Sequence, residues 1–189
     1  MKKWLALTVM TAGIVLLGWG IWQIASTHLQ TAQSLEEAKK AVAVDQGMSK
    51  KQFAPEMGKA AGILTIPKLK ADLPIVEGTD ADDLAKGVGH YKGSYYPDQN
   101  GQIVLSGHRD TVFRRTGELD IGDQLKITVP YGEFVYEITH TKIVDQHDTS
   151  IITLQNEKEE LVLTTCYPFH FVGNAPERYI IYAKRVSAK

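Results

Sequence analysis

The sequence predicts an all-β domain, mainly strands with short helices, that closes into a single β-barrel behind an N-terminal transmembrane helix. Two observations predict this fold: an uncharged apolar run near the N-terminus, and short β-rich runs separated by turn residues further along. The length of 189 residues suits one compact domain with an appendage. We expect a cytoplasmic tip at 1–3, a membrane anchor at 4–25, an extracytoplasmic stalk at 26–60 and a barrel domain at 61–189.

The anchor is the run from Trp4 to Ala25, which carries no formal charge. As a helix it would span about 33 Å, enough to cross a hydrocarbon core of ~30 Å. Lys2 and Lys3 precede the run, and the next formal charge is Glu36. The positive-inside rule therefore places the N-terminus in the cytoplasm and the rest of the chain outside.

A cleaved signal peptide is the alternative interpretation of the same run. Its apolar region would be shorter, about 7–15 residues, and would end in small residues at the cleavage site. The sequence Gln23-Ile24-Ala25 fits that pattern poorly. Both interpretations place the barrel domain outside the cytoplasm.

The segment from Thr31 to Gln52 is polar and contains no proline. Glu36 and Lys40 have the spacing of an ion pair on one helix face. We expect a helical or partly ordered, solvated stalk.

The barrel strands are expected where β-branched and aromatic residues gather between turn residues. A break at Pro130–Gly132 predicts a hairpin, and short helices are expected at 80–86 and 111–118. The predicted strands are 63–66, 73–76, 103–106, 124–129, 134–143, 160–166 and 179–186.

Charge and cysteine content exclude several function classes. The chain has 21 Lys and Arg against 22 Asp and Glu, so it lacks the basic excess of a nucleic-acid-binding protein. Its single cysteine excludes an internal disulfide framework and a cysteine-rich zinc site.

That cysteine, Cys166, ends an apolar strand just before Tyr167-Pro168. Proline cannot continue a central strand, so the thiol is expected at a strand terminus that faces a loop. Judged alone, a cysteine is more often a small buried hydrophobe than a nucleophile. An unpaired thiol outside the cytoplasm is exposed to oxidation, however, and this favours a chemical role.

A nucleophilic thiol needs a base or a cationic partner, because the thiolate is the attacking species. His108 follows a strand and Gly107, so a tight bend is expected to present its imidazole at a strand end. Arg178 begins the last strand, and an antiparallel return would make it the cross-strand neighbour of Cys166. Its guanidinium stays charged and suits the stabilisation of an oxyanion.

Taken together, these segments resemble a known family. Leu163-Thr164-Thr165-Cys166, Ser106-Gly107-His108-Arg109-Asp110 and Arg178 are similar to the signature segments of the sortases, the membrane-bound cysteine transpeptidases of Gram-positive cell envelopes. The resemblance covers about 61–186 and implies a closed barrel of about eight strands. Val162 departs from the usual motif, which has a threonine four positions before the cysteine.

The resemblance implies a function and its partners. Residues 107–115 and 166–169 are similar to class D sortases. A sortase would cleave an LPxTG-like sorting signal of a secreted protein, with Cys166 as nucleophile, His108 as acid and base, and Arg178 on the oxyanion. The acceptor would be the amine of a peptidoglycan precursor or cross-linking peptide. We expect no cofactor and no nucleic-acid partner.

Four residues are expected to contact the substrate: Thr165 by a hydrogen bond to the substrate backbone, and Ile151, Ile152 and Leu154 as an apolar pocket for the Leu-Pro of the signal. These three apolar side chains fit equally well a role in packing under their loop. Acidic residues cluster at 118–123 and at 145–148. Neither cluster has the spacing of a calcium loop, and no metal site is expected.

Two alternatives remain at this point. One is a membrane-tethered β-barrel that binds a partner without catalysis, in which Cys166 would be inert. The other is an L,D-transpeptidase-like cysteine enzyme, but that family places a Ser-His-Gly-Cys sequence at the nucleophile. Here Thr164-Thr165 precede Cys166.

Overall fold

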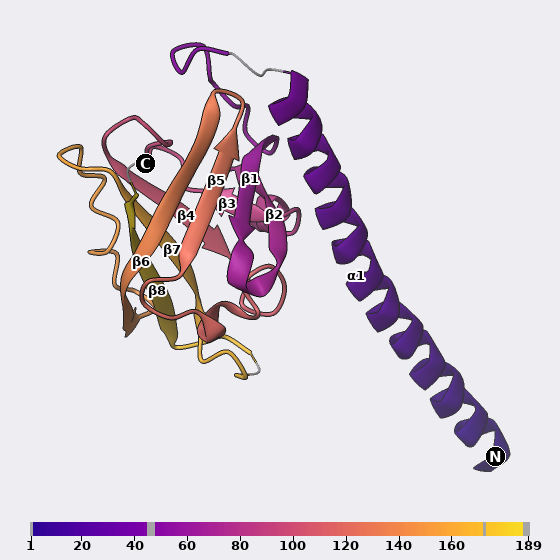
Figure 1. Ribbon diagram of the computed structural model, residues 1–189. Helices are drawn as coiled ribbons and strands as arrows, with labels where there is room; N and C mark the ends of the chain where they lie inside the picture. The colour runs from indigo at the N-terminus through magenta and orange to yellow at the C-terminus, as the bar shows by residue number, and fades with distance from the viewer. Residues whose placement is uncertain (1, 45–47, 172, 187–189) are drawn as a thin grey trace.

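The computed structural model describes residues 2–44, 48–171 and 173–186, which form a β-barrel with one long helix beside it (Figure 1). Met1 of the expected tip, 45–47 of the expected stalk, and 172 and 187–189 of the expected domain lie outside the described residues. The elements are α1 (Lys2–Val44), β1 (Ala60–Ile66), η1 (Pro67–Leu69), β2 (Ala71–Glu77), α2 (Ala81–Leu84), β3 (Val88–His90), β4 (Gln102–Gly107), η2 (Thr116–Glu118), β5 (Gln124–Val129), β6 (Gly132–Asp145), β7 (Glu160–Tyr167) and β8 (Glu177–Arg185).

The strands close into a barrel in the order β1-β2-β3-β4-β7-β8-β6-β5, which confirms the expected fold of about eight strands. The predicted hairpin joins β5 to β6, with Val129 paired to Gly132. Strand β4 runs parallel to β7, and β7 runs antiparallel to β8. The carboxyl ends of β4 and β7 therefore meet the amino end of β8 at one place on the barrel.

Two clusters of buried apolar side chains lie on opposite faces of these three strands. The larger cluster fills the barrel and includes Leu105, Leu163 and Ile181. The smaller cluster lies on the outer face and includes Val104, Val162, Ile180, Val144 and Ile151. Since successive side chains of a strand alternate between its faces, each strand supplies both clusters.

Two local features differ from the sequence pattern. That pattern does not predict β3, which pairs with β2 through Val88 and Gly89. A side chain at Gly89 would approach the Gly78 carbonyl oxygen to 2.4 Å, so this short strand depends on close backbone contact. The helix expected at 111–118 is wrong, because Phe113 turns into the core and only η2 is helical.

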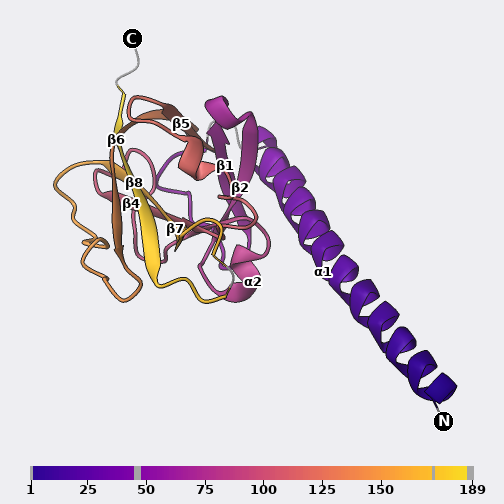
Figure 2. The same ribbon diagram turned by 90° about the horizontal axis from the view of Figure 1, so that it is seen from below.

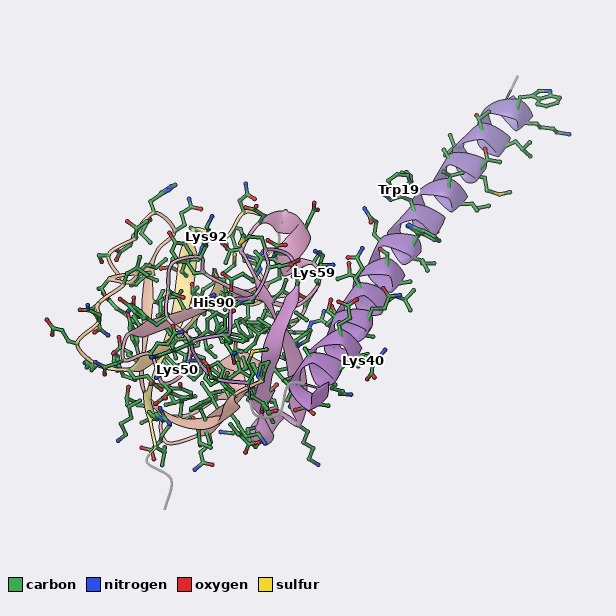
Figure 3. The ribbon with its side chains drawn as sticks, turned by 90° about the horizontal axis from the view of Figure 1, so that it is seen from above. Trp19, Lys40, Lys50, Lys59, His90 and Lys92 are labelled. Atoms are coloured by element: carbon green, nitrogen blue, oxygen red, sulfur yellow. The ribbon has the colours of Figure 1, made fainter. Side chains whose placement is uncertain are left out.

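The helix α1 continues without interruption from the expected anchor into the expected stalk. Its apolar part has the length and composition of a membrane span and is not buried against the barrel. Figures 1 and 3 show this part projecting away from the barrel, and Figure 3 labels Trp19 on it. Figure 2 shows that α1 lies on the β1–β2 side, away from β6 and β8.

The carboxyl-terminal half of α1 packs on the barrel instead of standing in solvent as a spacer. Ser34 and Ala38 are buried where α1 contacts β1 and β2. Their small side chains let the helix approach the sheet closely. Glu36 pairs with Lys39 at 2.9 Å, and not with Lys40 as its spacing suggested.

Candidate functional site

Strand alternation and register bring the three predicted catalytic side chains to one end of the barrel's outer face. Cys166 pairs with Arg178 across β7 and β8, as the sequence predicts. Gly107, the last residue of β4, pairs with Thr165 on β7, so His108 follows beside Cys166. By strand alternation, Cys166 and Arg178 continue the outer row that contains Val162 and Ile180.

Cys166, His108 and Arg178 line the same open pocket, which has a volume of about 320 Å³. The thiol is free and half-buried. The other lining residues of the pocket are Arg109, Asp110, Gln146, Gly173, Asn174 and Ala175. The barrel therefore supplies the floor, and the connections after β4, β6 and β7 supply the walls.

His108 is held by its backbone, which leaves its ring available. Its carbonyl oxygen accepts hydrogen bonds from the backbone N–H groups of Thr111 and Phe113, at 3.4 and 3.0 Å. A side chain at Gly107 would meet the Phe113 ring at 2.6 Å, so glycine is required for this bend. Within the described residues, the His108 imidazole makes no hydrogen bond.

Arg178 is fixed by the loop that precedes its strand. Its Nη1 donates to the carbonyl oxygens of Ala175 and Glu177, at 3.1 and 2.9 Å. These two bonds orient the guanidinium along the pocket wall. Its Nε and Nη2 donors have no acceptor among the described residues, so they can bind an oxygen atom of a ligand.

Thr165 makes a contact within the barrel that the sequence did not predict. Its side chain is buried on the inner face, and its hydroxyl donates to the Gly107 carbonyl oxygen at 2.7 Å. This bond joins β7 to β4 directly beneath Cys166 and His108. The hydroxyl thus stabilises the two strand ends that carry the thiol and the imidazole.

The apolar residues of the β6–β7 connection do not reach this pocket. Ile151 is buried in the outer cluster, Ile152 packs against the same cluster, and Leu154 is 37% exposed. Gln102 fixes the connection there: its amide donates to the Ile151 carbonyl oxygen at 3.1 Å and accepts from the Thr153 N–H at 2.9 Å. The structure therefore favours a packing role for Ile151.

Arg109 is a pocket residue that the sequence reasoning missed. Its Nη2 donates to the carbonyl oxygens of Phe171 and Gly173, both at 2.7 Å. These bonds tie the β7–β8 connection to the turn that carries His108. Its position next to His108 could have indicated a role in the pocket. The carbonyl oxygens that it contacts lie more than 60 residues away in sequence, so these hydrogen bonds could not be predicted.

The acidic residues near 118–123 are paired with cations. Lys68 contacts the carboxylates of Asp120 and Asp123 at 2.6 and 2.7 Å, and Glu118 contacts Arg115 at 2.7 Å. Across residues 2–44, 48–171 and 173–186, no three His, Cys, Asp or Glu side chains are grouped to hold a metal ion.

Comparisons with known proteins agree with this geometry. A family model described as "Sortase domain" matches residues 64–186. The chain is 63% identical over 198 residues to Sortase D of Bacillus subtilis (strain 168), an alignment that covers 99% of this chain and 100% of that protein.

Solved structures show the same likeness. A Clostridium perfringens Sortase D5 transpeptidase has a TM-score of 0.72 and 26% identity, with coverage of 84% of this chain and 99% of that one. The catalytic domain of B. anthracis SrtD has 39% identity and a TM-score of 0.60, with coverage of 75% and 97%. These findings set aside both the non-catalytic barrel and the L,D-transpeptidase-like enzyme. The chain belongs to the sortase family of cysteine transpeptidases and is similar to its class D members.

Proposed function

We propose that this sortase cleaves an LPxTG-like sorting signal of secreted proteins and transfers them to a cell-wall amine through a thioester on Cys166. The observation that carries this proposal is the shared pocket of Cys166, His108 and Arg178 at three adjacent strand ends. A thiol, an imidazole and a guanidinium are the groups that acyl transfer through a covalent intermediate requires.

In the first step, the Cys166 thiol gives its proton to His108, and the thiolate attacks the carbonyl carbon of the signal's threonine, in the bond to glycine or alanine. The Nε and Nη2 donors of Arg178, which have no acceptor among the described residues, stabilise the oxyanion that develops. His108 gives a proton to the leaving amine, the C–N bond breaks, and a thioester remains. The place of the imidazole in the pocket, without a hydrogen bond to any described residue, supports this role.

In the second step, an amine of a peptidoglycan precursor or cross-linking peptide attacks the thioester. His108 now accepts a proton from the attacking nitrogen, and sulfur leaves as the Cys166 thiolate. Of the four predicted substrate contacts, Thr165 uses its hydroxyl within the barrel and Leu154 keeps an exposed side chain. Contact of Leu154 with the Leu-Pro of the signal stays a prediction.

The N-terminal helix α1 would hold the enzyme in the membrane, with the N-terminus in the cytoplasm and the barrel outside. Its uncharged apolar length and the lysines that precede it support this orientation. Residence at the outer membrane surface would keep the pocket where secreted proteins and cell-wall precursors both arrive.

The test uses the full chain in detergent micelles with LPxTG and LPxTA peptides, with and without an amine acceptor. Mass spectrometry is expected to detect cleavage after threonine and an additional product that depends on the amine. Cys166→Ala, a variant that leaves the barrel intact, is the matched control and should give neither product. Absence of cleavage of every signal peptide by the folded wild-type chain would exclude the proposed function.

A further inference from the structure

Among the described residues that line the pocket of Cys166, Asp110 supplies the single carboxylate. Its side chain is exposed and makes no hydrogen bond or ion pair with any residue in the described part of the chain. Arg109, its neighbour, directs its guanidinium to Phe171 and Gly173 instead. The carboxylate is therefore available to a ligand that enters the pocket.

Asp110 also lines a second hollow, of about 630 Å³, between α1 and the turn after His108. Gln23, Ile24, Thr27, His28 and Thr31 line it from the α1 side; Leu73, Thr111, Val112 and Arg114 line it from the barrel side. This hollow lies at the end of the apolar part of α1. Asp110 thus lines both this hollow and the pocket that contains His108.

Two substrates must use this pocket in turn, and they differ in charge. The acyl donor is a neutral peptide bond, whereas an alkyl amine is mainly an ammonium ion at neutral pH. Such a cation meets two guanidiniums in the pocket, those of Arg109 and Arg178. The Asp110 carboxylate, which lines the same pocket, offsets this repulsion and attracts the cation.

We propose that Asp110 binds the ammonium group of the acceptor and thereby selects a cationic amine over water. The inference rests on the proposed function, since it concerns the second half of that reaction. Asp110 is a specificity-determining residue here: it holds the acceptor nitrogen near His108, and His108 carries out the proton transfer.

The bonds and protons balance as follows. The bound ammonium loses one proton to solvent water, and its lone pair attacks the thioester carbonyl carbon. A C–N bond forms, the C–S bond breaks, and the electron pair leaves with the Cys166 sulfur. The second proton of the nitrogen passes to His108 and from there to the thiolate, which restores the free thiol.

The test compares Asp110→Asn with the wild type in the full chain in detergent micelles. The acceptors are glycinamide, which is mainly cationic at neutral pH, and hydroxylamine, which is neutral. Thioester formation and capture by hydroxylamine should be unchanged. The KM for glycinamide should rise by about fivefold, the size of an exposed charge pair, and the product should shift from aminolysis toward hydrolysis. Added salt should reduce the difference.

Asp80→Asn is the matched control, because Asp80 is an exposed aspartate whose side chain makes no capping hydrogen bond and lies outside the pocket. It should behave as wild type. An equal loss with both acceptors, a slower thioester formation, or an unchanged KM for glycinamide in Asp110→Asn would overturn the inference. A wild-type chain that forms no thioester would instead contradict the proposed function itself.

Discussion

Two histidines of the same barrel, His90 and His108, differ in almost every contact. His90 is 1% exposed, and its Nδ1 lies 2.7 Å from the Glu77 carboxylate. Its Nε2 lies 2.9 Å from the Ser94 hydroxyl and 3.0 Å from the Tyr95 carbonyl oxygen. The ring of His108 lines an open pocket and, among the described residues, has no hydrogen-bond partner.

The contacts of the buried His90 ring stabilise the fold. Its ring stacks on Tyr96 with centroids 3.9 Å apart, and the Tyr96 hydroxyl donates to Glu77 at 2.6 Å. Burial raises the pKa of Tyr96, and the charge of Glu77 raises it further. Figure 3 shows His90 within the barrel domain. A buried polar group with every partner present stabilises the fold, whereas an unpartnered one beside a thiol is free to act on a substrate.

The largest expected effect separates the two histidines directly. His108→Ala should lower kcat/KM for transfer by about 10²- to 10⁴-fold, the usual contribution of a general acid and base, and leave the unfolding free energy unchanged. His90→Ala should lower the unfolding free energy and leave kcat/KM for transfer unchanged. It removes a partner of a buried carboxylate and should cost about 3 kcal/mol of stability, with activity per folded molecule preserved.

Steady-state kinetics and urea unfolding of both variants, in the full chain, measure this contrast. If His108→Ala lost stability and kept its activity, the assignment of roles to the two histidines would be wrong.

Arg178 combines the properties of the two histidines. Its Nη1 holds the preceding loop, whereas its Nε and Nη2 have no acceptor among the described residues. Arg178→Lys keeps the charge but loses the planar fork, and should lower kcat by about 10²- to 10³-fold, as loss of an oxyanion donor does. The rate of Cys166 alkylation by iodoacetamide should show that the pocket remains accessible. Full activity of the lysine variant would contradict the role of the planar guanidinium.

Substitution of Arg109 should have a smaller effect on activity, because Arg109 holds the β7–β8 connection that forms a wall of the pocket. Arg109→Gln removes two charged hydrogen bonds to the β7–β8 connection, each worth about 1.5–3 kcal/mol in a protected setting and less where solvent competes. Amide hydrogen exchange should quicken at 173–177, and the KM for the sorting peptide should rise several-fold. Arg114→Gln, at an exposed arginine that does not line the pocket of Cys166, is the control. If amide hydrogen exchange at 173–177 were unchanged in Arg109→Gln, Arg109 would not hold the β7–β8 connection to the turn after β4.

The smallest expected effect is the acid sensitivity of the His90 cluster. Burial alone would raise the pKa of Glu77, but hydrogen bonds from His90 and Tyr96 outweigh it and hold this pKa below its ordinary value. The contribution of Glu77 to stability is therefore present above the unfolded pKa of about 4.3 and is lost as pH falls through the lower folded value.

The wild type should consequently lose stability between neutral pH and about pH 3 more steeply than Glu77→Gln, which has no carboxylate to protonate. Urea unfolding of both chains across this range measures the difference. Parallel pH profiles would show that Glu77 has no such role.

Local sequence signals were sufficient to predict that Cys166, His108 and Arg178 lie at neighbouring strand ends, but not to predict the contacts that hold the surrounding loops. The strand ending at Cys166 and the antiparallel return to Arg178 follow from alternation, Pro168 and loop length. The path of the β6–β7 connection depends on Gln102, about 50 residues away in sequence. Strand β3 has no β-rich run of its own and exists through its pairing with β2 and β4. Such long-range contacts leave no periodic pattern in the sequence.

The most direct measurement is the intact mass of the full chain after brief reaction with an LPxTG peptide and an acid quench. A mass increase equal to the peptide's acyl part, located on Cys166 by fragmentation and removed by hydroxylamine, is the expected result. His90→Ala, where folded, should still form this adduct, and His108→Ala should accumulate it far more slowly. An adduct on another residue, or turnover without any adduct under conditions that trap thioesters, would contradict the role of Cys166.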